Sequence, residues 1–134
     1  MFDIPASAPY NGTMSKILIV EDNESVRLVL STRLERSGFE VAQAEDGFVG
    51  LDEAKRFRPD LVLLDLLMPE VDGFEFLKHF QDKDRYPRSK VIVFSNSGNK
   101  EDTDKALALG AHRFAVKAGT SIKDLHSMIE ELLK

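Results

Sequence analysis

The sequence predicts an α/β fold in which a five-stranded parallel sheet is doubly wound, with helices on both faces. The first observation is that short apolar runs alternate along the chain with segments whose apolar residues recur at helical spacing. The second is that the most apolar run, residues 61–64, contains no polar residue, which is typical of a strand buried on both faces of a parallel sheet. Because crossovers between parallel strands are right-handed and usually helical, five alternations place helices on both faces.

The size and composition of the chain are those of one globular domain. Its 134 residues are 43% apolar and 31% charged, and we expect a domain over residues 16–134 after a disordered amino-terminal tail, residues 1–15. The formal net charge of −5 argues against binding nucleic acid, and the chain has no cysteine for a disulfide or a thiolate metal site. Neither a membrane span nor a signal peptide is visible, so we expect a cytoplasmic protein that contacts no membrane.

The first two strand–helix units are marked by changes of periodicity. Residues 17–20 form an unbroken apolar strand, and the apolar residues after it recur at helical spacing until Gly38, which is well placed to end a helix. Residues 40–44 are expected to form the second strand. Residues 46–57 are expected to form the second helix, which Pro59 stops.

The other three units follow the same order. Residues 61–64 form the third strand, and Phe74, Phe76 and Phe80 are expected to pack the third helix against the core. The fifth helix has capping-box spacing between Ser121 and Asp124, with Asp where Glu or Gln is usual. The remaining expected elements are strands at residues 91–94 and 113–116 and helices that begin near residues 73, 100 and 121.

Four of the five strands end in polar groups that can meet at one edge of the sheet. These groups are Glu21 and Asp22 after the first strand, Asp65 after the third, Ser95 after the fourth and Lys117 after the fifth. In open α/β sheets the ligand crevice lies outside the carboxyl ends of the strands. Taken singly, each residue has an ordinary explanation as a helix cap, a turn residue or a solvated lysine. Their occurrence together indicates a site.

The residue types in this set suit phosphoryl chemistry. Three carboxylates in one crevice repel one another unless a cation offsets them, and an oxygen-only cluster suits a hard ion such as Mg²⁺. Asp65 can act as a nucleophile that forms an acyl phosphate. Lys117 supplies a positive charge for phosphate oxygens, and Ser95 supplies a hydroxyl group.

The order of these motifs resembles the receiver domain of two-component response regulators. The matching residues are Val-Glu-Asp after the first strand, Leu-Leu-Asp-Leu-Leu-Met-Pro-x-x-Asp-Gly around Asp65, and the strand-ending serine and lysine. The resemblance covers about residues 16–134 and implies a flavodoxin-like, receiver-type fold. It implies that Asp65 accepts a phosphoryl group from a phosphohistidine of a sensor histidine kinase or a histidine phosphotransfer protein.

The resemblance also implies a role for each site residue. Asp22 and Asp65 would bind Mg²⁺ directly, with the backbone carbonyl of Leu67 as a further ligand and Glu21 acting through water. Lys117 would contact the phosphate, while Ser95 and Phe114 would change position together as a switch. Ala118 follows Lys117 where the family usually has a proline after a cis bond, so we expect a trans bond here.

The expected function is that of a single-domain response regulator rather than an enzyme. Its downstream protein partner would bind the fourth helix, fifth strand and fifth helix, and a homodimer is left open. One alternative is a Mg²⁺-dependent phosphatase with a strand-end aspartate nucleophile. Phosphatases of the haloacid-dehalogenase type need a second aspartate where this chain has Leu67. A second alternative is a receiver-like scaffold that works without phosphate.

Overall fold

The computed structural model describes residues 14–134, which form one five-stranded parallel sheet of strand order β2-β1-β3-β4-β5. The strands are β1 (Lys16–Val20), β2 (Glu40–Ala44), β3 (Leu61–Leu64), β4 (Lys90–Ser95) and β5 (Arg113–Val116). The helices are α1 (Glu24–Arg36), α2 (Gly47–Phe57), α3 (Gly73–Phe80), α4 (Lys100–Ala108) and α5 (Ile122–Leu133), with a 3-10 turn η1 (Lys117–Gly119). The predicted fold class is confirmed. Nearly all of the expected disordered tail lies outside the described residues.

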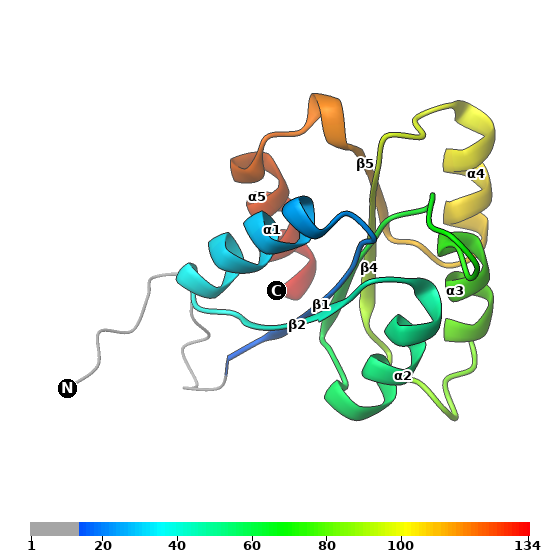
Figure 1. Cartoon of the computed structure of the whole chain (residues 1–134), viewed down its shortest axis with the longest axis horizontal. Helices are drawn as coiled ribbons and strands as arrows, with labels where there is room; N and C mark the ends of the chain where they lie inside the picture. Colours follow the sequence, from blue (N-terminus) through cyan, green and yellow to red (C-terminus); the bar gives the residue numbers. More distant parts are fainter. Residues whose placement is uncertain (1–13) are drawn as a thin grey trace.

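Two layers of helices enclose the sheet, because alternate residues of each strand face opposite sides. Helices α1 and α5 cover one face, and α2, α3 and α4 cover the other (Figure 1). In β1, Ile17 and Ile19 belong to the core cluster with α1 and α5, whereas Leu18 and Val20 belong to the cluster on the opposite face. None of the helices within residues 14–134 is long and apolar enough to cross a membrane.

The aromatic residues of α3 pack into the core, as the sequence predicts. Phe76 and Phe80 are almost fully buried, and their rings stack with centroids 5.1 Å apart. Phe74 is half-buried against the same cluster. These rings therefore fill the space between α3 and the sheet.

Gly73 allows α3 to begin directly against the end of β3. Its backbone N–H donates to the carbonyl of Leu66 at 3.0 Å. A Cβ atom at position 73 would clash with the carbonyl oxygen of Asp65 and with the Cα of Leu66. Only glycine permits this approach, so the first turn of α3 and the backbone of Asp65 are held together.

The amino end of β5 is held by a pair of hydrogen bonds between His112 and Val91. Its backbone N–H donates to the carbonyl of Val91 at 2.8 Å, and its Nδ1 accepts from the N–H of Val91 at 3.0 Å. The sequence predicts a surface or helix-end position for this histidine, and His112 is exposed, but the contact of its ring with Val91 is not predicted. Partial burial lowers the pKa of His112, and the nearby positive charges of Lys90, Lys83 and Arg113 lower it further.

We predict that the free energy of unfolding decreases as the pH is lowered, because His112 must stay neutral to accept this bond. The pKa of His112 is lower in the folded state than in the unfolded chain, so the unfolded state binds the proton more tightly. The stabilisation is complete above about pH 6.5, the usual histidine pKa, and is lost as pH falls through the folded-state value. His112→Asn keeps an acceptor without a titratable ring, so urea denaturation of this variant should show a smaller decline toward about pH 5.5.

The matched control is His79→Asn, which removes an imidazole from the exposed face of α3. This control should not reduce the pH dependence of unfolding. Equal pH profiles for the wild type and His112→Asn would contradict the structural role of the neutral ring.

Candidate functional site

The structure brings together the three carboxylates that follow β1 and β3. Glu21, Asp22 and Asp65 each offer an oxygen atom, and these atoms lie within 4.8 Å of one another. Glu21 and Asp65 are buried, whereas Asp22 is exposed. The pairing of β1 with β3 explains this meeting, because Val20 lies opposite Leu64 and each strand places an acid just beyond that pair.

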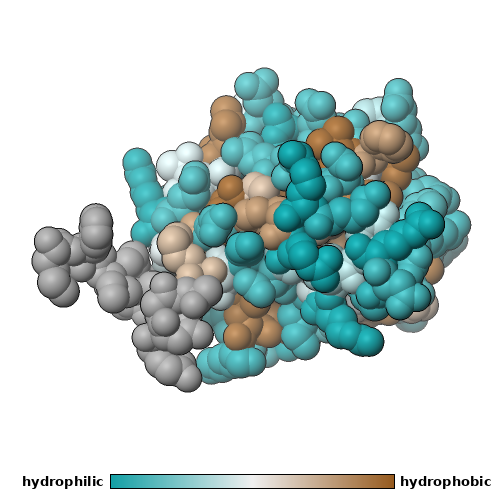
Figure 2. Space-filling view, turned by 90° about the horizontal axis from the view of Figure 1, so that it is seen from below, coloured by the Kyte–Doolittle hydropathy of each residue, from teal (hydrophilic) through white to brown (hydrophobic). Residues whose placement is uncertain are grey.

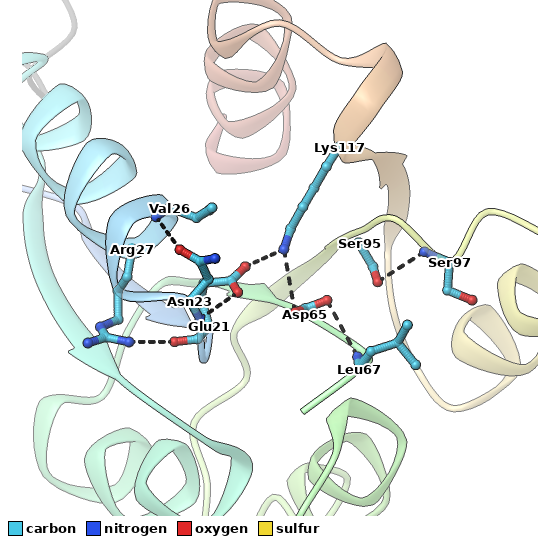
Figure 3. A network of polar contacts seen from close by, with 9 residues as sticks. All are labelled: Glu21, Asn23, Val26, Arg27, Asp65, Leu67, Ser95, Ser97 and Lys117. Atoms are coloured by element: carbon cyan, nitrogen blue, oxygen red, sulfur yellow. Dashed lines mark hydrogen bonds and ion pairs between the residues drawn. The ribbon is translucent and has the colours of Figure 1, made fainter. Parts of the chain in front are cut away.

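The ammonium group of Lys117 lies between the two buried carboxylates. Its Nζ is 2.5 Å from Oε1 of Glu21 and 3.4 Å from Oδ2 of Asp65 (Figure 3). Lys117 begins η1 directly after β5, and its side chain is only 17% exposed. A charge-assisted bond at this distance is strong for a pair shielded from water. The lysine therefore offsets part of the negative charge of the site.

Several hydrogen bonds from α1 and its cap fix the position of Glu21. Its Oε2 accepts from the N–H of Asn23 at 3.0 Å, and its backbone carbonyl accepts from the guanidinium of Arg27 at 2.8 Å. Burial raises the pKa of Glu21, and the charge of Asp65 adds to this effect. The bonds from Lys117 and Asn23 act in the opposite direction and favour the ionised form.

Asp65 continues the sheet at its backbone and turns its carboxylate into the site. Its N–H donates to the carbonyl of Val20 at 3.0 Å, and its Oδ1 accepts from the N–H of Leu67 at a long 3.4 Å. The Leu67 side chain is 61% exposed. The Asp65 carboxylate thus has an ammonium group on one side and a backbone N–H on the other, while an apolar side chain stands at the rim.

Ser95 and Phe114 come from the two strands on the other side of β3. Ser95 ends β4, is fully buried, and lies on the side of Asp65 away from Glu21 (Figure 3). Its hydroxyl accepts from the N–H of Ser97 at 3.4 Å. Phe114 in β5 is half-buried and packs against the core cluster of α2, α3 and α4. Its ring is therefore only partly enclosed.

The charge and chemistry of the site fit a divalent, oxygen-binding metal ion. Three carboxylates stand against the single ammonium of Lys117, which leaves a formal charge of −2 when all groups are ionised. The donor set contains oxygen atoms only, which favours Mg²⁺ or another hard cation over zinc or copper. Glu21, Asp22 and Asp65 are the residues that could hold such an ion.

Sequence reasoning missed two residues that shape the site. Asn23, rather than Glu21 or Asp22, caps α1, with its side chain accepting from the N–H of Val26 at 3.0 Å. Asparagine directly before a helical segment is a recognisable N-cap signal. Arg27 left no such signal, because a cation in the second turn of a helix normally points into solvent. All described peptide bonds are trans, including the one after Lys117, as Ala118 predicts.

Comparisons with known proteins agree on one family. The model of the response regulator receiver domain matches residues 17–130. The chemotaxis protein CheY of Treponema pallidum is 36% identical over 117 residues, which cover 85% of this chain and 80% of that protein. The alkaline phosphatase synthesis transcriptional regulatory protein PhoP of Bacillus subtilis is 33% identical, over 89% of this chain and 48% of that protein. The chain spans about half the length of the first curated relatives that it matches.

Solved structures show the same fold. The chemotaxis protein CheY4 of Vibrio cholerae superposes with a TM-score of 0.83 at 30% identity, covering 90% of this chain and all of that chain. A CheX-CheY-BeF3-Mg complex from Borrelia burgdorferi contains a chain that superposes with a TM-score of 0.86 over 98% of this chain. At 24% identity that second likeness supports the fold alone.

Proposed function

This chain belongs to the response regulator receiver domain family, and we propose from that premise that Asp65 accepts a phosphoryl group to control a protein partner. Receiver domains are signalling domains, and the proposed donor is a phosphohistidine of a sensor histidine kinase or a histidine phosphotransfer protein. Such donors are made in the cytoplasm, where we place this domain.

The observation that supports this function most directly is the buried Asp65 carboxylate 3.4 Å from the ammonium of Lys117. In the proposed step, a carboxylate oxygen of Asp65 forms a bond to phosphorus while the bond from phosphorus to the donor imidazole breaks. The imidazole keeps the electron pair and takes up a proton. Lys117 can then contact a phosphate oxygen in place of its 3.4 Å contact with the carboxylate of Asp65.

The acidic cluster supports a requirement for Mg²⁺. Glu21, Asp22 and Asp65 would hold the ion, with Glu21 acting through water and the backbone carbonyl of Leu67 as a further proposed ligand. When bound, Mg²⁺ would offset negative charge on both the carboxylate and the phosphoryl group. Within the protein, Glu21 and its bond to Lys117 keep the lysine beside the acceptor.

We propose that Ser95 and Phe114 convert phosphorylation into a change of surface. Ser95 is fully buried beside Asp65, where its hydroxyl can bind a phosphate oxygen after a short movement. Phe114 is only partly enclosed, so its ring has room to move with Ser95. The surface of α4, β5 and α5 would then change its affinity for a downstream protein by a population shift.

A phosphatase reaction has less support. The second acid that the haloacid-dehalogenase type requires is replaced by Leu67, whose side chain has no acid–base function. A scaffold that works without phosphate would keep this fold, and the next experiment separates it from the proposed switch.

We predict that acetyl phosphate with Mg²⁺ adds one phosphoryl group to the wild type, measured by intact mass spectrometry. Asp65→Asn removes the nucleophile and should show no adduct. Lys117→Gln should slow formation by about 10²-fold, the typical loss when one stabilising group for developing charge is removed. Failure of the wild type to take up phosphate, or equal uptake by Asp65→Asn, would contradict the assignment and favour the scaffold.

We predict that millimolar Mg²⁺ raises the melting temperature, because an ion that binds only the folded state stabilises it. At ten times the dissociation constant the gain is about 1.4 kcal/mol, or roughly 4 to 8 °C for a domain of this size. Asp22→Asn should raise the melting temperature in metal-free buffer, since it relieves repulsion among the acids, and should weaken the response to Mg²⁺.

The control for the metal titration is Asp84→Asn, an equal loss of charge at an exposed position before β4. This variant should keep the full response to Mg²⁺. A wild-type melting curve that does not move during the titration would contradict the metal site.

We predict that Leu67 prolongs the phosphorylated state by keeping water from the acyl phosphate. Its backbone N–H already bonds Asp65, and its exposed apolar side chain stands two residues beyond the acceptor. Leu67→Asn would supply a polar group to orient water and should shorten the half-life by about tenfold, a barrier change of about 1.4 kcal/mol. Loss of phosphate can be followed by mass spectrometry.

Leu107→Asn is the matched control, because it changes another exposed leucine, on α4, to the same residue. Its half-life should equal that of the wild type. Rapid loss of phosphate from the wild type, unchanged by Leu67→Asn, would refute the shielding role.

A further inference from the structure

A groove of about 350 Å³ lies at the end of the sheet opposite the phosphorylation site. Its walls come from three segments: residues 58–60 before β3, residues 87–90 at the start of β4, and residues 132–134 at the end of α5. Because the strands are parallel, these segments lie at the amino ends of β3 and β4, whereas Asp65 follows the carboxyl end of β3. We call this feature the basic groove.

Four exposed cationic side chains and one side-chain carboxylate line the basic groove. The cations are Arg58, Arg88, Lys90 and Lys134, and within residues 14–134 none of them forms an ion pair. The carboxylate, Asp60, accepts a hydrogen bond from the backbone N–H of Lys16 at 2.8 Å. The chain as a whole has a formal net charge of −5, so this groove differs in sign from the rest of the molecule.

Helix dipoles account for only part of this cluster. Arg58 caps the carboxyl end of α2 and Lys134 caps that of α5, where cations are favoured by the partial negative charge of the helix end. Arg88 and Lys90 belong to neither helix, and Lys90 is the first residue of β4. Local structure therefore does not explain why these two cations face the same groove.

Burial and, after it, the positive charge of the groove lower the pKa values of two neighbouring groups, Lys83 and His112. Burial lowers the pKa of Lys83, and the positive charge of Arg88 lowers it further. The lowered pKa of His112 likewise has contributions from Lys90 and Lys83 after that of burial. The cations thus repel one another across this end of the molecule, and a bound anion would relieve that repulsion.

The basic groove also has an apolar part. Pro59 is buried, and Pro87, Leu132 and Leu133 are half-buried among the lining residues. Figure 2 views the molecule from below Figure 1, the side toward which the amino ends of the strands point, and shows hydrophilic residues with smaller hydrophobic patches between them. A ligand that fits this groove carries negative charges around at least one apolar group.

We propose that the basic groove binds an acidic segment of a partner protein, with an apolar side chain of that segment against Pro59, Pro87 and the end of α5. All four cations are exposed, which suits a peptide laid along the surface better than a small anion that needs enclosed donors. Nucleic acid is disfavoured by the acidic net charge and by the small size of the groove. The site is separate from the proposed phosphoacceptor.

The test is fluorescence anisotropy at low ionic strength with a labelled peptide of glutamates that has leucine at every third position. The wild type should bind it, and Asp65→Asn should bind equally well because the acceptor lies at the other end of the sheet. Arg88→Gln and Lys90→Gln should each weaken binding by about two- to fivefold, and the double variant by about tenfold, as expected for exposed ion pairs. Higher salt should weaken binding as well.

The matched control is the double variant Arg36→Gln with Lys123→Gln, which removes two exposed cations from α1 and α5 away from the groove. It should bind the peptide like the wild type. No binding by the wild type, or equal losses in both double variants, would overturn the proposal. Displacement of the peptide by an equal or lower concentration of inorganic triphosphate or oligothymidylate would overturn it too, by assigning the groove to a small anion or to nucleic acid.

Discussion

The site depends on one electrostatic constraint, which is that two carboxylates cannot remain ionised side by side in a buried position without a cation. Lys117 meets this constraint by placing its ammonium 2.5 Å from Glu21 and 3.4 Å from Asp65. The lysine reaches both acids because β5 ends at the same edge of the sheet as β1 and β3. A cation that follows the last strand thus offsets part of the negative charge of the acids that follow the first and third strands.

Most of the fold could be predicted because it follows from apolar periodicity. The core strands contain almost only branched apolar residues, and Gly38, Pro59 and Gly110 mark ends of elements. The meeting of Glu21, Asp22, Asp65 and Lys117 could be predicted for a related reason. Parallel strands place all their carboxyl ends at one edge, so residues far apart in the chain converge without any local signal between them.

The features that could not be predicted depend on the relative placement of particular side chains. The sequence predicts only a surface or helix-end position for His112, yet its Nδ1 completes the pairing of β4 with β5. Arg27 looks like a solvated helix residue, yet it bonds the carbonyl of Glu21. The basic groove arises from three segments that have only modest charge by themselves. In each case the pattern of residue types is ordinary, and the contact exists only once the chain has folded.

The close approach at Gly73 has a consequence for how this domain can be altered. The six residues from Leu67 to Asp72 leave β3 and return to the same backbone, where the N–H of Gly73 bonds Leu66 and no Cβ can be placed. The two ends of this loop are therefore held next to each other by the bond between Gly73 and Leu66. Residues inserted beside Asp65 therefore belong between Leu66 and Gly73, with both of these positions left unchanged.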